Sequence, residues 1–489
     1  MKQKRLMVQL ISRHTIMTAL ILIAAFASQV QAEAKWSANK KALVSSVDKH
    51  EKNLIDISDK IWSYAELALM EHQSAKILSD YAENNGFTVE RGVAGMPTAF
   101  IATYGSGRPR IGILGEFDAN AGISQKAQPT KEALVTGAPG HGCGHNLFGT
   151  GSLGAAIAVK ELIEKKKLKG TVVYFGTPAE ETIFGKTFMA RAGLFDDLDV
   201  CMDWHPGDNL EASTQSSKAL VDFRVKFFGK AAHASSDPWN GFSAVDGMEL
   251  YTTGLNYYRE HIRPTARIHY HIEAAGDVVN VVPEHAQIWT RVRENDRENL
   301  NIVYERVKKI AEGAAMMAEV DYSMELISGI YEIQPNRTGA AALLKNMELL
   351  GDITYSKKEI EYAKTIQRET NKSEDGMDAD IEPLRETLPA QGGSTDVGDV
   401  SQIVPVVRAR ITAAPKDVPW HSWAVVACTG MSIGHKGMLF AAKSLGMTMV
   451  DLFQNPQLVR DVKAEFKERK GTKVYKAMIP DGPPPVPEQ

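Results

Sequence analysis

TVVYFGTPAEE, residues 171–181, is an apolar run that ends in Gly-Thr-Pro and two glutamates. Its β-branched and aromatic residues, followed by turn-forming residues, predict a buried strand. Similar short strands are expected at 110–114 and 199–202. Apolar residues at helical spacing predict helices at 42–70, 74–84 and 147–165. Strands that alternate with helices predict an α/β fold with a mostly parallel central sheet.

The middle of the chain has a different order of expected elements. Strands and helices are predicted there as βαββαβ, at 219–228, 243–260, 267–273, 286–292, 300–319 and 320–327. This is the ferredoxin-like order. The α/β pattern resumes with an expected helix at 338–349. We therefore predict an inserted domain at 216–330 that splits the main domain into 33–215 and 331–475, with a proline-rich, disordered tail at 476–489.

The N-terminus has the features of an export signal. Residues 1–13 carry four basic residues and no acid, and the apolar run 15–27 is too short to span a bilayer comfortably. We predict a signal peptide at 1–32, cleaved after Ala32. The protein is then exported, to the periplasm or outside the cell, without stable membrane insertion. A membrane anchor that stays attached is the alternative.

The charge of the chain argues against nucleic acid as a partner. The net charge is −4, and removal of the four positive charges in 1–32 makes it −8. No block of Lys and Arg is long enough to form a phosphate-binding face. The three cysteines are too few for a disulfide framework. Cys201 and Cys428 lie in apolar runs that favour the core, whereas Cys143 lies among glycines and histidines.

Candidate metal ligands occur in short motifs spread along the chain. They are Cys143 and His145 in HGCGH, Glu181 in TPAEE, His205 in DWHP and His421 in WHSW. Thiolate, imidazole and carboxylate groups bind zinc, manganese and cobalt. Several of these motifs lie at predicted strand ends, where open α/β sheets place their sites. Gly142 and Gly144 are expected to allow the unusual backbone angles that two such close donors require.

Glu180 is expected to act as a general base rather than as a ligand. Successive side chains on extended backbone point apart, so Glu180 and Glu181 do not easily share one ion. Asp118, after the strand at 110–114, is a candidate partner that orients a ligand imidazole. Together these residues predict a hydrolase that uses metal-activated water.

Two rival interpretations of the same region are weaker. GTGSLG at 149–154 matches a dinucleotide-binding glycine pattern, but no strand precedes it, so a closely packed helix start is favoured. Cys143 with a neighbouring histidine suits a thiol nucleophile. That interpretation leaves Glu181, His205 and His421 without a role.

The motifs resemble those of a known family. GEFDA, HGCGHN, TPAEE, DWHP, GKAAHAS, NVVPEHAQIWTRVR and GGSTDVGDVS occur in that order between residues 57 and 441. The chain resembles the two-metal aminoacylase and carboxypeptidase family of metallopeptidases, in its amidohydrolase branch. Within that branch it is most similar to the aminobenzoyl-glutamate hydrolase B-subunit group.

The resemblance implies roles that the residues alone do not. Cys143 would bridge two metal ions, and Glu180 would also protonate the leaving amine. The insert would be a lid or dimerisation domain, with His233 reaching the partner's active site in a homodimer to stabilise the oxyanion. Asn280 would lie near the substrate, and Arg293 would grip its carboxylate.

The expected activity is hydrolysis of the amide bond of an N-acyl or N-aroyl amino acid, with two divalent ions per subunit. Manganese and zinc are both expected candidates, and cobalt is possible. An exported dipeptidase and a non-catalytic acyl-amino-acid-binding or partner subunit remain as alternatives.

Overall fold

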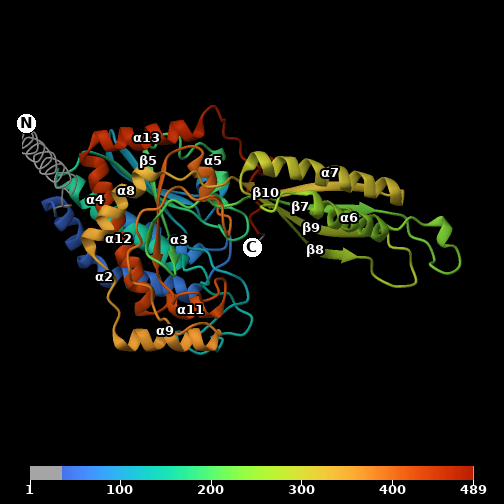
Figure 1. Cartoon of the computed structure of the whole chain (residues 1–489), viewed down its shortest axis with the longest axis horizontal. Helices are drawn as coiled ribbons and strands as arrows, with labels where there is room; N and C mark the ends of the chain where they lie inside the picture. Colours follow the sequence, from blue (N-terminus) through green and yellow to red (C-terminus); the bar gives the residue numbers. More distant parts are fainter. Residues whose placement is uncertain (1–35, 488–489) are drawn as a thin grey trace, which may run out of the picture. The chain divides into compact units, whose positions relative to one another are not determined.

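The computed structural model describes residues 36–487 and contains two sheets. The first has the strand order β1-β2-β4-β3-β5-β11-β6 (Figure 1). Its strands are β1 (Thr88–Arg91), β2 (Phe100–Ser106), β3 (Arg110–Gly115), β4 (Gly170–Gly176), β5 (Val200–Gly207), β6 (Glu211–Ser213) and β11 (Val406–Thr412). The four central strands, β4-β3-β5-β11, are parallel, and the outer pairings are antiparallel. The predicted α/β class with a parallel sheet centre is confirmed.

Helices surround this sheet because their apolar faces pack against it and against one another. They are α2 (Ala38–Tyr64), α3 (His72–Asn84), α4 (His145–Glu164), α5 (Gly185–Arg191), α8 (Arg337–Leu350), α9 (Lys357–Glu369), α10 (Val397–Ser401), α11 (Trp423–Thr429), α12 (Ser432–Gln454) and α13 (Pro456–Lys470). Helix α4 packs on β3, β4 and β5, and α12 and α2 pack on α4. The GTGSLG glycines lie inside α4, where a Cβ on Gly149 would come within 2.6 Å of the Glu116 carbonyl oxygen. They serve close packing, as favoured above.

The second sheet belongs to the insert and has the strand order β10-β7-β9-β8, with all pairings antiparallel. Its elements are β7 (Ala219–Phe228), α6 (Ala244–Tyr258), β8 (Arg267–Ala275), β9 (His285–Glu294), α7 (Arg297–Ala318) and β10 (Asp321–Ile330). Both helices contact each other and the strands β7 and β9, so they cover the same face (Figure 1). They enclose a hydrophobic core separate from that of the first sheet. The observed order is the expected βαββαβ.

Some elements differ from the expectations. Strand β5 continues through His205 instead of ending at residue 202, and β1, β2, β6 and β11 were not expected. Three short 3-10 turns complete the inventory of this part of the chain, η1 (Val93–Gly95), η2 (Pro238–Asn240) and η3 (Arg259–His261). Helix α9, in the charged stretch 356–388, buries Ala363, Ile366 and Gln367.

The proline-rich tail also differs from its expectation. Through residue 487 it follows a defined path, with the Arg191 guanidinium donating to the carbonyl oxygens of Pro480 and Gly482 at 2.8 and 2.6 Å. Met478 pairs with Gly329 of β10. These backbone contacts cannot be anticipated from composition, which alone suggested disorder.

The predicted signal peptide, residues 1–32, lies outside the described residues. Within residues 36–487, no helix combines the length and the apolar character that a membrane crossing requires.

Candidate functional site

Donor side chains meet at the carboxyl ends of the parallel strands. Asp118 follows β3, Glu180 and Glu181 follow β4, and His205 lies near the end of β5. Neighbouring parallel strands end at one edge of the sheet, so these side chains lie together, as predicted.

The HGCGH loop brings in the other donors. His145 is the first residue of α4, and Gly144 before it has a φ of 76°, in the left-handed region that favours glycine. Gly142 allows close packing rather than the backbone angle that was expected. Its φ is not positive, but a Cβ there would lie 2.3 Å from a methyl group of Ile123. The Gly142 carbonyl accepts a hydrogen bond from the backbone N–H of His421 at 3.0 Å, which ties the distant histidine to this loop.

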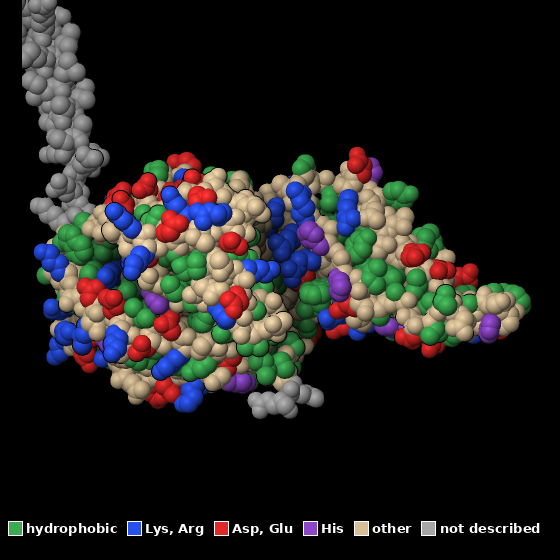
Figure 2. Space-filling model, turned by 90° about the horizontal axis from the view of Figure 1, so that it is seen from below, with side chains coloured by type: hydrophobic (Ala, Val, Ile, Leu, Met, Phe, Trp, Pro, Cys, Tyr) green, Lys and Arg blue, Asp and Glu red, His purple; other side chains and the backbone are tan. Residues whose placement is uncertain are grey.

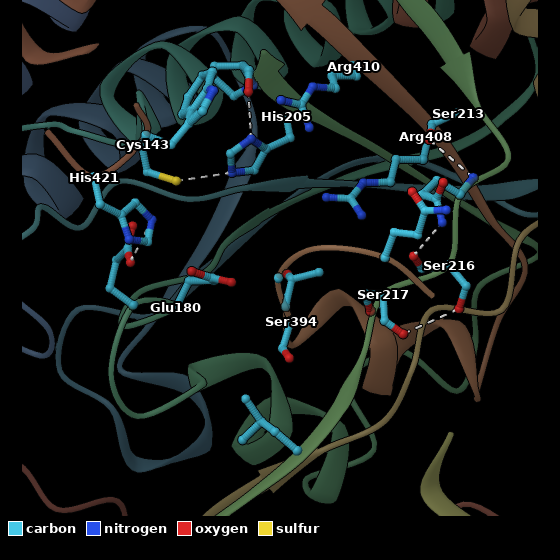
Figure 3. A pocket seen from close by; sticks show the side chains of 18 of the residues that line it. Cys143, Glu180, His205, Ser213, Ser216, Ser217, Ser394, Arg408, Arg410 and His421 are labelled. Carbon is cyan, nitrogen blue, oxygen red and sulfur yellow. Dashed lines mark hydrogen bonds and ion pairs between the residues drawn. The ribbon is translucent and has the colours of Figure 1, made fainter. Parts of the chain in front are cut away.

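The structure brings all five predicted ligands together. Figure 3 shows Cys143, His205 and His421 among them at the cavity. Cys143 Sγ lies 3.4 Å from His205 Nε2, and Glu181 Oε2 lies 3.6 Å from His421 Nε2. The donor atoms of Cys143, His145 and His205 lie within 4.8 Å of one another, as do those of Cys143, Glu181 and His421. Cys143 belongs to both groups, which gives two adjacent places for a cation.

The protonation states of these side chains suit a divalent cation. The His205 Nδ1–H donates to the Pro206 carbonyl oxygen at 2.7 Å, so the Nε2 lone pair faces Cys143. Burial lowers the pKa of His205 to about 3, which keeps the ring neutral. Burial, with the Glu181 charge, raises the pKa of the Cys143 thiol and so disfavours the thiolate. A bound cation would favour the thiolate again. Glu181 Oε1 is buried without a hydrogen-bond partner, and His145 Nε2 lies 3.0 Å from Glu116 Oε2. The site fits two metal ions.

Asp118 contacts two of the predicted ligands. Its Oδ1 accepts a hydrogen bond from His145 Nδ1 at 2.8 Å, and its Oδ2 accepts one from the Glu181 backbone N–H at 2.9 Å. This is the position expected for a group that orients a ligand imidazole.

Glu180 points away from Glu181 into a different group of side chains. Its carboxylate gathers with Glu116 and His145. Burial, reinforced by the negative charges of Glu116 and Glu181, raises the pKa of Glu180 well above its usual value. Ala179, directly before it, has a φ of 62°, a strained value for a residue with a Cβ. The backbone N–H of Ala179 donates to the buried Glu71 carboxylate at 2.9 Å. The path of the chain therefore fixes the direction of Glu180.

Sequence reasoning missed a buried charge cluster beneath Glu180. Lys186 Nζ lies 2.5 Å from Glu116 Oε1 and 2.7 Å from Asp396 Oδ1. All three side chains are essentially inaccessible to solvent. Burial alone would lower the pKa of Lys186, but the charges of Asp396 and Glu116 raise it instead. The motifs GEFDA and GGSTDVGDVS contain the two acids, whereas nothing in the sequence pattern singles out Lys186.

A cavity of about 420 Å³ opens onto the donors and is rich in arginine. Besides Cys143, Glu180 and other site residues, its lining includes Ser213, Gln215, Ser217, Leu220, Arg291, Arg293, Ser394, Arg408, Arg410 and Trp420. Arg293 therefore lies where a substrate-binding residue was expected. The face in Figure 2 shows Lys and Arg side chains gathered at a hollow beside the insert, whereas charges of both signs mix elsewhere on that face.

His233 and Asn280 do not line this cavity. His233 is exposed, and its Nδ1 accepts hydrogen bonds from the backbone N–H groups of Ser235 and Ser236, each at 3.1 Å. The Asn280 carbonyl oxygen accepts a hydrogen bond from the Ala234 N–H, which holds the two predicted residues near each other. Within the described part of this one chain, the structure does not bring them to the donors.

Comparisons with known proteins identify the family. The sequence profile of peptidase family M20/M25/M40 matches residues 112–371. The B-subunit of the p-aminobenzoyl-glutamate hydrolase of Escherichia coli strain K12 is 37% identical over 462 residues, covering 88% of this chain and 95% of that protein. The human Xaa-Arg dipeptidase is 29% identical over 440 residues, covering 86% and 90%.

A solved structure supports the fold. The dinuclear metal-binding peptidase of the M20 family from Bacillus subtilis matches with a TM-score of 0.57 at 18% identity, covering 83% of this chain and 99% of that one. The family predicted from the motifs is confirmed, and with it the class of enzyme. The chain belongs to the peptidase family M20/M25/M40 and is a metallo-amidohydrolase.

Proposed function

We propose that this protein hydrolyses the amide bond of N-aroyl or N-acyl amino acids, with aminobenzoyl-glutamate as the reference substrate. The observation that carries the proposal is the pair of donor groups that share Cys143, set beside the buried carboxylate of Glu180. The similarity to the hydrolase of Escherichia coli over most of both chains supports the substrate class.

In this proposal two divalent ions would be held by Cys143, His145, Glu181, His205 and His421, and Cys143 belongs to both donor groups. When bound, the ions polarise the substrate carbonyl and lower the pKa of water, and manganese, zinc and cobalt all suit these donors. Glu180 takes a proton from the attacking water and gives it to the leaving amine nitrogen.

Export and dimerisation are parts of the same proposal. Residues 1–32 would direct the chain to the periplasm or outside the cell, which a fractionation of cells expressing the full chain tests. His233 would act in the active site of a second copy, because it is exposed and lies outside its own subunit's cavity. With both Ser235 and Ser236 donating to Nδ1, a neutral His233 carries its proton on Nε2 and can donate to an oxyanion. Asn280 would approach the substrate with it.

The proposal is tested with purified protein loaded with manganese or zinc. Release of 4-aminobenzoate from 4-aminobenzoyl-glutamate is compared with hydrolysis of aliphatic acyl amino acids and of dipeptides ending in arginine. The proposal expects turnover of an acyl amino acid that a chelator abolishes. Preferential cleavage of the dipeptides would favour the dipeptidase alternative. Tight binding without turnover by the metal-replete protein would favour a non-catalytic role.

A further inference from the structure

Four arginines line the cavity, and they come from two different sheets. Arg291 and Arg293 extend from β9 of the insert, and Arg408 and Arg410 extend from β11 of the main sheet. Only Arg293 serves a role that the motifs suggested. A ligand in the cavity therefore meets a second pair of arginines, with Glu211 paired opposite Arg410, that the proposed function does not yet use.

The register of β11 places this second pair of arginines beside the metal ligands. Strand β11 pairs in parallel with β5, so that Arg410 lies opposite His205 and Arg408 lies opposite Asp203. Directly paired residues on neighbouring strands point to the same face of a sheet. Both arginines thus lie on the side of His205, and Figure 3 shows the Arg408 guanidinium directed into the cavity.

The Arg408 guanidinium forms an ion pair through Nε, and its two terminal nitrogens lie on the opposite edge. Its Nε lies 2.7 Å from Oδ2 of the fully buried Asp203, and the Arg408 side chain is 18% exposed. Among residues 36–487, neither terminal nitrogen of Arg408 makes a hydrogen bond, and the guanidinium forms its ion pair with Asp203. A guanidinium anchored through Nε presents a planar pair of N–H donors, which matches the two oxygens of a carboxylate.

Arg410 and Ser394 add unsatisfied donors to the same cavity. The Arg410 Nη2 donates to Asp208 Oδ1 at 2.9 Å, and the guanidinium lies 5.7 Å from the ring centre of Trp420. Its Nε is buried without a partner, and so is the hydroxyl oxygen of Ser394. Buried polar groups without partners at a cavity wall indicate a polar ligand that completes their hydrogen bonds.

We propose that Arg408, with Arg410 beside it, forms a second carboxylate-binding subsite, which selects substrates whose amino acid is acidic. Arg293 binds the carboxylate next to the amide, and Arg408 binds the side-chain carboxylate of glutamate or aspartate. This inference rests on the proposed amidohydrolase function. Asp203 lies against Arg408 and Asp208 against Arg410, so the subsite selects through the N–H donors that these acids leave open. A side-chain amide offers them one oxygen and one N–H₂ group, so it leaves a donor unpaired.

The test compares two substrates of nearly equal shape, 4-aminobenzoyl-glutamate and 4-aminobenzoyl-glutamine. We expect the metal-loaded wild-type enzyme to show a kcat/KM for the glutamate compound roughly 10- to 100-fold above that for the glutamine compound. Arg408→Gln should reduce this ratio to near one, mainly by loss of activity on the glutamate compound. Arg224→Gln is the matched control, because Arg224 is also paired through Nε with a carboxylate, that of Glu273 at 2.9 Å, but lies outside the cavity. It should leave the ratio unchanged.

A second variant covers the case in which Arg408→Gln fails to fold because Asp203 loses its partner. Arg408→Gln combined with Asp203→Asn removes the buried pair together, and its folding is checked by thermal melting. Binding of both compounds to metal-loaded Glu180→Gln protein, with and without these changes, is measured by calorimetry. A glutamate preference in binding that the Arg408 variants lose supports the subsite even where turnover is absent, which would count against the proposed function alone. Equal kcat/KM and equal binding of the two compounds by the wild-type and Arg408 proteins would overturn the subsite.

Discussion

Oδ1 of Asp118 lies 2.8 Å from Nδ1 of His145, while Oδ2 of the same carboxylate accepts the backbone N–H of Glu181. One side chain thus sets the tautomer of one predicted ligand and the position of another. Nε2 of the same ring lies 3.0 Å from Glu116 Oε2, and a ring that keeps its proton on Nδ1 and loses the one on Nε2 could bind a cation through Nε2. Asp118 is fully enclosed, so no solvent competes for these hydrogen bonds.

Asp118→Asn should weaken metal binding by roughly 10- to 100-fold, because an amide cannot accept both hydrogen bonds. Titration of the metal-free protein with zinc or manganese, followed by calorimetry, measures the change. Asp197→Asn, at an exposed carboxylate, is the control and should bind metal as the wild type does. Unchanged affinity in the Asp118 variant would show that His145 is oriented by other contacts.

Glu180→Gln should lose catalytic turnover by about 10²- to 10⁴-fold while keeping its metal, since a glutamine of the same shape cannot accept the proton. Metal content by elemental analysis and kcat on an accepted substrate are measured on the same sample. Glu181→Gln provides the contrast, because it should lose metal as well as turnover. Retention of near-wild-type kcat by the Glu180 variant would refute its assignment as the base.

Lys186→Met should destabilise the fold by about 3–5 kcal/mol, because it leaves the buried carboxylates of Glu116 and Asp396 without their cation. Denaturation in urea, followed by fluorescence, measures the loss. Combining Lys186→Met with Glu116→Gln and Asp396→Asn removes all three charges and should recover much of the stability. If the single variant is as stable as the wild type, the cluster does not contribute through its ion pairs.

Most of the candidate metal ligands could be brought together from the sequence, because their positions follow from local patterns. Turn-forming residues after an apolar run such as 171–175 mark where the strand ends. Neighbouring parallel strands then place these ends at the same edge of the sheet. This rule was enough to place Glu181 and His205 together. The HGCGH motif identified Cys143 and His145 as further candidate ligands.

Other parts of the site depend on contacts between distant segments. Lys186 pairs with Asp396, 210 residues away, and no local pattern marks either residue as buried. Strand β11 has two arginines at alternate positions, a pattern that resembles a solvated strand. Arg408 is tolerated near the interior because buried Asp203 lies opposite it, and this pairing exists only after β5 and β11 meet. Sequence periodicity contains no information about such long-range partners.

Glu359 should make the stability of the α9 region depend on pH. Burial alone would raise its pKa, but hydrogen bonds from Lys436 and Ser432 and the backbone N–H of Ser356 outweigh burial and lower it to about 2. A carboxyl whose pKa is lowered by folding stabilises the protein above its unfolded value of 4.5, and this contribution disappears as pH falls toward 2. Glu359→Gln should therefore lower the free energy of unfolding by at most roughly 3 kcal/mol at pH 7. The difference in this free energy between wild type and variant should shrink as the pH falls below 4.5.

Urea denaturation of both proteins between pH 3 and pH 7, on the order of five steps, measures that difference. Glu369→Gln, at an exposed residue of the same helix, is the control and should show little difference at any pH. A Glu359 variant whose deficit stays constant over this range would show that packing, not ionisation, is responsible.

His233 should complement a neighbouring subunit's active site. His233→Ala and Glu180→Gln each remove one part of every site in their own homodimers, so each should have little activity. In a mixed dimer, the subunit that retains Glu180 receives His233 from its partner and has one complete site. Random pairing of equal amounts should restore about a quarter of wild-type activity, because half of the dimers are mixed and each has one working site of two. Co-expression with two affinity tags isolates the mixed dimers for assay.

Pairing His233→Ala with a variant carrying both changes should give no recovery, since no subunit then supplies His233. If mixed dimers of His233→Ala and Glu180→Gln are isolated but show no recovery of activity, His233 does not act in the partner's active site. It would then act within its own subunit or take no part in the reaction.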